Sequence, residues 1–192
     1  MPALTPRGTR ATAVVALLAL AAVAASIAAA PDLRGMLGAG LALLMLAIAV
    51  VDAQRFIIPD ELTATSLALA FVYAAVIDPQ AVWESIALAA LRGAALALVF
   101  LGVRAVHARL RGREGLGLGD VKLAGVAGAW LDWLTIPIAI EIAALAALAI
   151  YLMRNFLRGR PIRATGRLPF GLFLAPAIWL SWLIETVLLV PF

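Results

Sequence analysis

Several kinds of side chain are missing or nearly missing from this 192-residue chain. It contains no cysteine and one histidine, His107, and its one lysine is Lys122. Without cysteine the chain can form no disulfide, no cysteine nucleophile and no thiolate metal ligand. A lone histidine cannot build a zinc site of two or three imidazoles, and no HExxH motif is present. We therefore expect neither a metal nor another cofactor.

Charge is also scarce, at 14% of residues, whereas hydrophobic residues make up 65%. A soluble domain is nearer half apolar and a quarter charged, and a disordered chain needs low hydrophobicity and high net charge. The composition excludes both classes, and we expect no binding of nucleic acid. Since a helix needs about 20 residues to cross a bilayer, the length allows about six to eight crossings. Little is left for a domain outside the membrane.

The apolar runs predict an all-α, polytopic membrane helix bundle of about seven transmembrane helices, forming a single domain over residues 1–192. The fifth run is short and contains glycine, so it is either tilted or joined to the sixth as a re-entrant pair. The first follows two arginines and ends in three alanines, and so resembles a signal peptide. Because Pro31 would directly follow the cut, we expect an uncleaved span instead. The spans are expected near 11–30, 35–51, 62–78, 84–106, 118–131, 134–153 and 169–190.

Arginines indicate the orientation, because short cytoplasmic loops carry an excess of basic residues. Two clusters follow the fourth and the sixth spans, whereas the loop around Asp78 and the turn at Asp132 carry no basic residue. We expect both clusters in the cytoplasm, with the N-terminus inside and the C-terminus outside. Binding of anionic lipid is the other role open to them. The clusters are Arg104, Arg109, Arg111 and Arg113, and Arg154, Arg158, Arg160, Arg163 and Arg167.

Two acidic residues stand out, Asp52 at the end of the second span and Asp120 at the start of the fifth. The predicted topology places both at the cytoplasmic membrane edge. Two carboxyls that lie close together share one proton, because both cannot ionise cheaply. The ionised one can take a proton from water while the protonated one donates to a scissile carbonyl, which is aspartic protease chemistry. The structural alternative is that each is a solvated cap at a span end.

The residues before Asp120 and after it bear on this chemistry. Gly117 and Gly119 lack a Cβ, so they can break the helix before the acid and let a substrate backbone approach closely. Lys122 could lower the pKa of an acid or bind the substrate. A helical residue at i+2 points elsewhere, so the alternative for Lys122 is to snorkel to the membrane interface.

The chain between the second and third spans is expected to be irregular. Pro59 restricts Ile58 to an extended conformation, so residues 57–59 should form a short irregular segment that turns into the third span. Asp60 would then be the N-cap of that span. Binding a basic segment of a substrate is the second role open to Asp60.

Two charges and four tryptophans lie within or beside the spans. Arg92 and Glu141 lie inside the fourth and sixth spans, and we expect them to form a structural ion pair, because intramembrane charges are usually paired or functional. The tryptophans are expected to serve as interfacial anchors or in packing. They are Trp130, Trp133, Trp179 and Trp182.

At three motifs the chain resembles the prepilin peptidases, which are membrane aspartic proteases of the GxGD type. The motifs occur in the family's order and cover most of residues 36–180. They are Asp52 with Ile58-Pro59-Asp60-Glu61-Leu62-Thr63, then Gly117-Leu118-Gly119-Asp120-Val121-Lys122-Leu123, and then Pro169-Phe170-Gly171-Leu172-Phe173-Leu174-Ala175.

The resemblance implies an endopeptidase of the bacterial inner membrane. Such an enzyme removes the short basic leader from type IV prepilins or from type II secretion pseudopilins at the cytoplasmic face, with the substrate helix reaching the site sideways between spans. Asp52 and Asp120 match the family's catalytic pair, while Glu61 and Glu114 could help to attract the basic leader. The candidates for substrate binding or for support of the pair are Gly117, Gly119, Asp60, Lys122 and Pro59.

Many members of the family carry an N-terminal cytoplasmic domain with two Cys-x-x-Cys pairs, which is associated with zinc and N-methylation. This chain resembles the short, peptidase-only form, so we expect no methylation.

Two other functions stay open. One is a small ion-coupled or proton-coupled transporter that uses the same two aspartates, although it lacks an evident internal repeat. The other is a noncatalytic assembly factor of a pilus or secretion machine.

Overall fold

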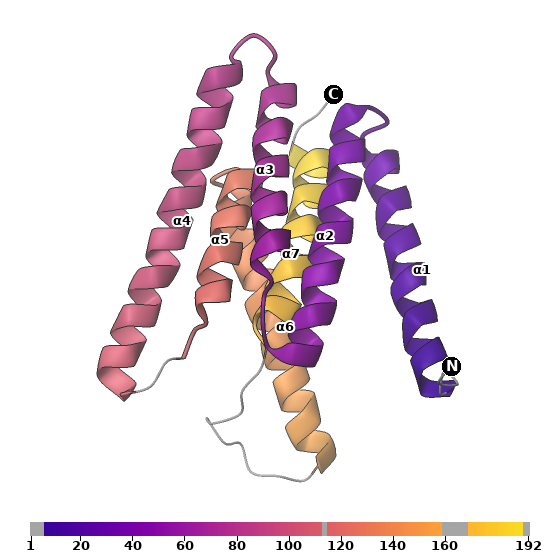
Figure 1. Cartoon of the computed structure of the whole chain (residues 1–192), viewed down its shortest axis with the longest axis vertical. Helices are drawn as coiled ribbons and strands as arrows, with labels where there is room; N and C mark the ends of the chain where they lie inside the picture. The colour runs from indigo at the N-terminus through magenta and orange to yellow at the C-terminus, as the bar shows by residue number, and fades with distance from the viewer. Residues whose placement is uncertain (1–5, 113–114, 159–168, 190–192) are drawn as a thin grey trace.

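The computed structural model describes residues 6–112, 115–158 and 169–189, and within these ranges every regular element is helical (Figure 1). The predicted all-α fold is confirmed. The elements are α1 (Pro6–Ala29), α2 (Leu33–Arg55), α3 (Asp60–Ile77), α4 (Val82–Arg111), α5 (Leu118–Trp130), α6 (Thr135–Arg158), α7 (Gly171–Ile184) and the π-helical turn η1 (Glu185–Leu189).

Six helices of the described ranges are long and apolar enough to cross a membrane, and α5 is the exception. With 13 residues it is about 20 Å long, whereas the hydrocarbon core is about 30 Å thick. The fifth segment predicted over 118–131 forms as the short helix that its length and glycines suggested, and its length alone does not carry it across the hydrocarbon core. It packs against α3 and α4, and its turn into α6 lies short of the ends of both (Figure 1).

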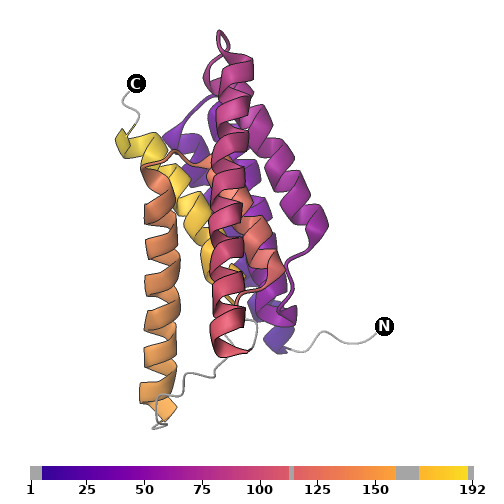
Figure 2. The same cartoon turned by 90° about the vertical axis from the view of Figure 1, so that its left-hand side faces the viewer.

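Successive helices run in opposite directions, so the connections alternate between the two ends of the bundle (Figures 1 and 2). One end carries residues 56–59, residues 115–117 and the start of α7; we call it the site end. The last turns of α4 and α6, which carry basic residues, point the same way. The arginine distribution predicts that this end faces the cytoplasm. Four residues of the clusters lie outside the described residues: Arg113, Arg160, Arg163 and Arg167.

The helices α4 and α5 approach each other closely at glycines. A Cβ on Gly128 would lie 2.5 Å from the carbonyl oxygen of Arg92, and a Cβ on Gly93 would lie 2.9 Å from the carbonyl oxygen of Gly125. Small residues permit this approach in membranes, where close packing rather than the hydrophobic effect holds helices together. The contact fixes the position of α5, and with it Asp120 in the first turn of that helix.

Aromatic side chains join α5 and α7 to α3 in the core. Trp130 and Trp182 are buried, and the ring of Tyr73 lies 4.8 Å from the first and 6.2 Å from the second. Trp130 also donates a hydrogen bond of 2.9 Å from Nε1 to the carbonyl oxygen of Ser66. These two tryptophans serve in packing, one of the two roles expected for them, whereas Trp133 is exposed beyond the end of α5.

Arg92 does not pair with Glu141, so the expected ion pair is wrong. Its Nε donates to the carbonyl oxygen of Gly128 at 3.3 Å, and its Nη1 lies 3.4 Å from Oδ1 of Asp132. Glu141 is exposed on α6. The reason is the shortness of α5, which ends before the edge of the bundle and so brings Asp132 to the depth of Arg92.

Glu185 completes this polar cluster from the end of α7. Its Oε2 accepts hydrogen bonds from the backbone N–H of Asp132, at 3.2 Å, and from the hydroxyl of Thr135. The cluster therefore connects α4, the α5–α6 turn and the π-helical turn at the end opposite the site end.

Candidate active site

Asp52 lies in the last turn of α2 with its side chain buried, at 5% exposure. The helix ends because Phe56 adopts a left-handed conformation, with φ at 55°. The Oδ2 atom of Asp52 accepts a hydrogen bond of 2.8 Å from the backbone N–H of Leu172, and the N–H of Gly171 also acts on this carboxylate. The first N–H groups of a helix have no partner within it, so the start of α7 is suited to hold an anion.

Asp120 lies in the first turn of α5. Gly117 is the N-cap of this helix, and its backbone N–H donates a hydrogen bond of 3.0 Å to Oδ2 of Asp120. The carboxylate thus reaches back to the N-cap, as the third residue of a capping box does. The break that the glycines predict before the acid occurs at Gly117, whereas Gly119 is already helical.

Ile58 fills the space between two glycines that are far apart in the sequence. A Cβ on Gly119 would lie 2.9 Å from Cβ of Ile58. A Cβ on Gly171 would lie 2.7 Å from Cδ1 of Ile58 and 2.8 Å from Oδ2 of Asp52. Ile58 belongs to the irregular segment 57–59, which forms as predicted. One buried side chain therefore joins the loop after α2 to the starts of α5 and α7.

Asp52 and Asp120 come together at the site end and act on each other. Burial raises the pKa of Asp120 above its ordinary value, the N–H of Gly117 lowers it to a smaller extent, and the charge of Asp52 raises it again. A raised pKa favours the protonated form of Asp120 beside Asp52. This is the electrostatic pattern expected of two acids that share a proton.

Asp60 and Lys122 form an ion pair between α3 and α5. The Nζ of Lys122 lies 2.6 Å from Oδ1 of Asp60, and the two side chains are 50% and 72% exposed. The expected N-cap role of Asp60 is wrong, because Pro59 occupies the N-cap and Asp60 is the first helical residue. Its carboxylate is free to reach Lys122 for that reason. Lys122 therefore pairs with an acidic residue, whereas the sequence suggested that it could extend to the membrane interface.

Of the two glutamates expected to attract a basic leader, one lies within the described residues. Glu61 is exposed in the first turn of α3, beside Asp60. Glu114 lies outside the described residues. Among the residues that the structure does describe, no group of three or more histidine or acidic side chains is placed to hold a metal ion.

Two groups that hold the site together had no role in the sequence analysis. The backbone N–H of Leu172 is one, and a signal for it exists: proline and glycine before an apolar run mark a helix start, where free N–H groups attract a carboxylate. Ile58 is the other. Its contacts with Gly119 and Gly171 join distant segments, and no local pattern shows them.

The fold and site define a class of protein, a multi-pass helical membrane protein in which two aspartates from different helices meet at one end of the bundle. A family profile described as "Type IV leader peptidase family" matches residues 39–152, more than half of the chain. Asp52, Ile58 and Asp120 all fall within this range. The chain belongs to the type IV leader peptidase family.

Relatives from several bacteria agree with this membership. A "Prepilin leader peptidase/N-methyltransferase" of Burkholderia pseudomallei is 38% identical over 139 residues, which are 71% of this chain and 42% of the relative. A protein of the same description from Aeromonas hydrophila is 29% identical over 147 residues, 74% of this chain and 47% of the relative. The chain thus spans less than half the length of these two relatives.

A shorter relative is matched over most of its length. The "Leader peptidase HopD" of Escherichia coli is 32% identical over 126 residues, which are 66% of this chain and 78% of the relative. No solved structure matches the chain. None of these comparisons supports the transporter alternative.

Proposed function

We propose that the chain is a membrane aspartic endopeptidase that removes the basic leader from type IV prepilins or type II secretion pseudopilins. The observation that carries the proposal is that Ile58 links the segments that hold Asp52 and Asp120 at one end of the bundle, close enough for the charge of the first to raise the pKa of the second. The relatives' names, leader peptidase and prepilin leader peptidase, support this substrate class.

The proposed reaction needs only the two carboxyls and water. Asp52, held by the N–H groups at the start of α7, is the ionised member and accepts a proton from a water molecule. The water oxygen attacks the scissile carbonyl carbon while Asp120 donates its proton to the carbonyl oxygen. The tetrahedral intermediate then collapses: one of its hydroxyl protons returns to Asp120, the C–N bond breaks, and the amide nitrogen leaves with the proton that Asp52 took from water. No covalent intermediate with the enzyme forms.

The other candidate residues have supporting roles in this proposal. The N–H of Gly117 orients the carboxylate of Asp120. Gly119 and Pro59 position Ile58, the first by leaving room for its side chain and the second by ending the irregular segment. Asp60, with Lys122 as its partner, lies where the basic leader would pass.

The location of the site is part of the same proposal. The site end would face the cytoplasm, and the protein would reside in the bacterial inner membrane, surrounded by lipid, as a single domain. The basic residues on the last turns of α4 and α6 support this orientation by the positive-inside rule. A leader that has not crossed the membrane would then meet the two aspartates directly.

The experiment is cleavage of a candidate prepilin by the purified full-length chain in lipid vesicles. We expect the wild-type protein to release the leader, and Asp52→Asn and Asp120→Asn to abolish cleavage while still inserting and remaining folded. Asp78→Asn, in the loop at the opposite end, is the matched control and should cleave normally. Wild-type rates in either of the first two variants would contradict the proposal, as would ion flux that depends on the same aspartates without cleavage.

A further inference from the structure

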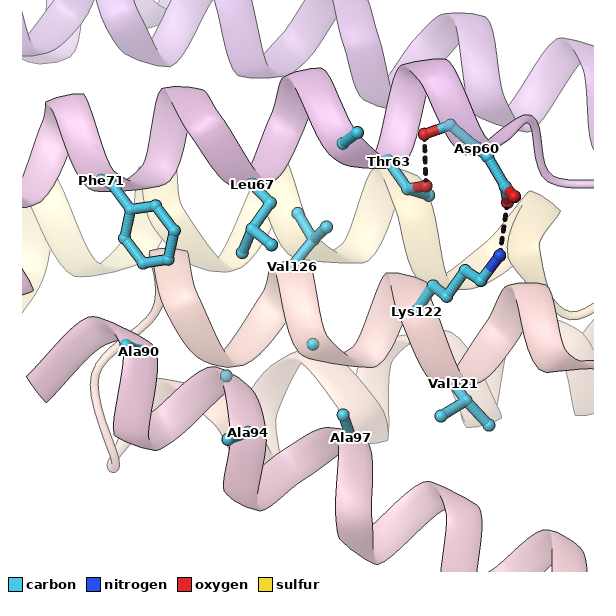
Figure 3. A pocket seen from close by; sticks show the side chains of 13 residues that line it. Asp60, Thr63, Leu67, Phe71, Ala90, Ala94, Ala97, Val121, Lys122 and Val126 are labelled. Atoms are coloured by element: carbon cyan, nitrogen blue, oxygen red, sulfur yellow. Dashed lines mark hydrogen bonds and ion pairs between the residues drawn. The ribbon is translucent and has the colours of Figure 1, made fainter. Parts of the chain in front are cut away.

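A groove of about 570 Å³ lies between α3 and α4, with α5 as its floor (Figure 3). Leu67 and Phe71 of α3 face small residues of α4 across it, and Ala90 and Ala94 among these are exposed. The two walls join at the far end of the bundle and separate toward the site end, with α5 between them (Figure 1). The groove is therefore apolar, and it opens on the side surface of the bundle.

Charge is confined to one end of this groove. Among its lining residues the charged ones are Asp60 and Lys122, which pair with each other at the site end, whereas Phe71 lies toward the other end (Figure 3). Glu61 stands next to Asp60 and is exposed. Two carboxylates against one ammonium leave a negative balance there. The floor continues directly into the site, because Val121 lines the groove and follows Asp120.

We propose that this groove binds the apolar helix that follows the leader in the substrate, an inference that rests on the proposed function. The substrate of the proposed reaction carries a short basic leader followed by an apolar helix, and the bond to be cut lies between the two. The groove has the matching order, with acidic residues at the site end and apolar residues beyond. A substrate helix lying in it places the junction of the two segments, where the leader is cut, at the level of Asp120.

The surroundings favour a helix over a lipid as the occupant. Small residues along a helix let the backbone of a second helix approach closely, which is the main source of helix association in membranes. Ala90 and Ala94, one turn apart on α4, provide such a surface. An anionic lipid headgroup would need a free cation at the site end, but Lys122 is already paired with Asp60.

Cross-linking tests the proposal directly, because a chain without cysteine acquires a unique thiol with each substitution. Ala94→Cys places that thiol in the groove, and Val99→Cys, 58% exposed and about 140° further round α4, is the matched control. The partner is a prepilin with one cysteine at successive positions over one turn of its apolar segment. We expect oxidation to join the prepilin to Ala94→Cys and not to Val99→Cys.

The possible outcomes distinguish the groove proposal from the proposed peptidase function on which it rests. Cleavage of the prepilin by the wild-type protein, with no cross-link at Ala94→Cys or with equal cross-linking at Val99→Cys, would overturn the groove and leave the peptidase standing. Absence of cleavage by the wild-type protein would overturn both.

A second variant measures the same contact kinetically. Ala94→Phe fills the groove and should raise KM for the full prepilin by about tenfold, the scale of a blocked packing contact. A soluble peptide that carries the leader and the cleavage site without the apolar segment should be cut with unchanged KM. Val99→Phe should change neither value. An unchanged KM for the full prepilin in Ala94→Phe would overturn the proposal. This holds also if the substitution releases bound lipid, because the groove would then be a lipid site.

Discussion

The carboxylate of Asp52 and the backbone N–H of Leu172 are joined by a hydrogen bond of 2.8 Å, although 120 residues separate them in the chain. Asp52 is in the last turn of α2 and Leu172 is in the first turn of α7, and the two helices pack against each other. The bond therefore fixes the orientation of one carboxyl through a backbone N–H, which a substitution at Leu172 removes only if it introduces proline. The third motif, around Gly171, contributes to the site through its backbone.

Gly171→Ala should strongly slow cleavage. The new Cβ would lie 2.8 Å from Oδ2 of Asp52 and 2.7 Å from Cδ1 of Ile58, so one of them must move. A displacement of about 1 Å at a reacting group can lower the rate by about 100-fold. The measurement is the rate of prepilin cleavage at saturating substrate.

The double variant Gly171→Ala with Ile58→Val is the matched control. It removes Cδ1 of Ile58, which is the closest atom to the added Cβ, and should recover part of the lost rate. Ile58→Val alone should cost about 0.5–1.5 kcal/mol of stability. A wild-type rate of cleavage in Gly171→Ala would show that the close packing of Gly171 against Asp52 and Ile58 does not matter for the reaction.

The stability of the protein should fall as the pH rises through the titration of Asp120. Folding raises the pKa of this residue, so the folded state holds the proton more tightly than the unfolded chain does. The contribution of Asp120 to the free energy of unfolding is then fully present below the ordinary pKa of aspartate. It is lost as the pH rises through the higher pKa of the folded state. Thermal unfolding in detergent, followed against pH, should show this fall in the wild type and a smaller one in Asp120→Asn. Equal slopes would contradict the shift.

Asp52→Asn should lower the pKa of Asp120. The charge of Asp52 is one of the two causes that raise this pKa, and the substitution removes it while burial remains. The value should therefore decrease without returning to that of an exposed aspartate. Infrared spectroscopy of the protonated carboxyl band against pH measures the change, and Asp60→Asn, at an exposed ion pair, serves as the comparison.

Gly128→Ala should destabilise the bundle by about 1–3 kcal/mol. Its Cβ would lie 2.5 Å from the carbonyl oxygen of Arg92, a backbone atom that cannot rotate away. Gly102→Ala is the control on α4, because a Cβ there has no atom within 4 Å. That variant should be neutral or slightly stabilising, since alanine is the better helix former. Similar losses in both variants would argue against close packing of α4 on α5.

Arg92→Met should destabilise the protein by about 1–3 kcal/mol, because it leaves the partners of a mostly buried guanidinium unsatisfied. Glu141→Gln should have little effect, since Glu141 is exposed and makes no ion pair with Arg92. Unfolding in detergent measures both. A large loss in Glu141→Gln, together with rescue by a charge swap with Arg92, would instead restore the pair that the sequence suggested.

The sequence predicts the helices and the common level of Asp52 and Asp120 for a physical reason. A bilayer leaves helices as the way for apolar segments to satisfy their backbone groups, and arginines mark the side of each loop. Together these two rules place the end of α2 and the start of α5 at the same end of the bundle. No contact between side chains is needed for that inference.

The parts that sequence reasoning missed depend on contacts between distant segments. The pairing of Arg92 with Asp132 depends on where α5 ends beside α4, and Gly93 of α4 and Gly128 of α5 let the two helices pack closely there. The ion pair of Asp60 with Lys122 depends on the distance between α3 and α5. Periodicity and composition describe each helix separately, so neither could show these distances.

The polar cluster around Arg92 and Glu185 has a consequence for the opposite end of the molecule. Arg92 donates to a carbonyl oxygen in the last turns of α5, and Glu185 accepts from the backbone N–H of Asp132 in the α5–α6 turn, so polar groups at the end of this short helix have partners within the protein. Asp120 therefore lies in the first turn of a 13-residue helix whose other end is held by this polar cluster. How far the acid extends toward the site end is thus determined in part by residues at the other end of the bundle.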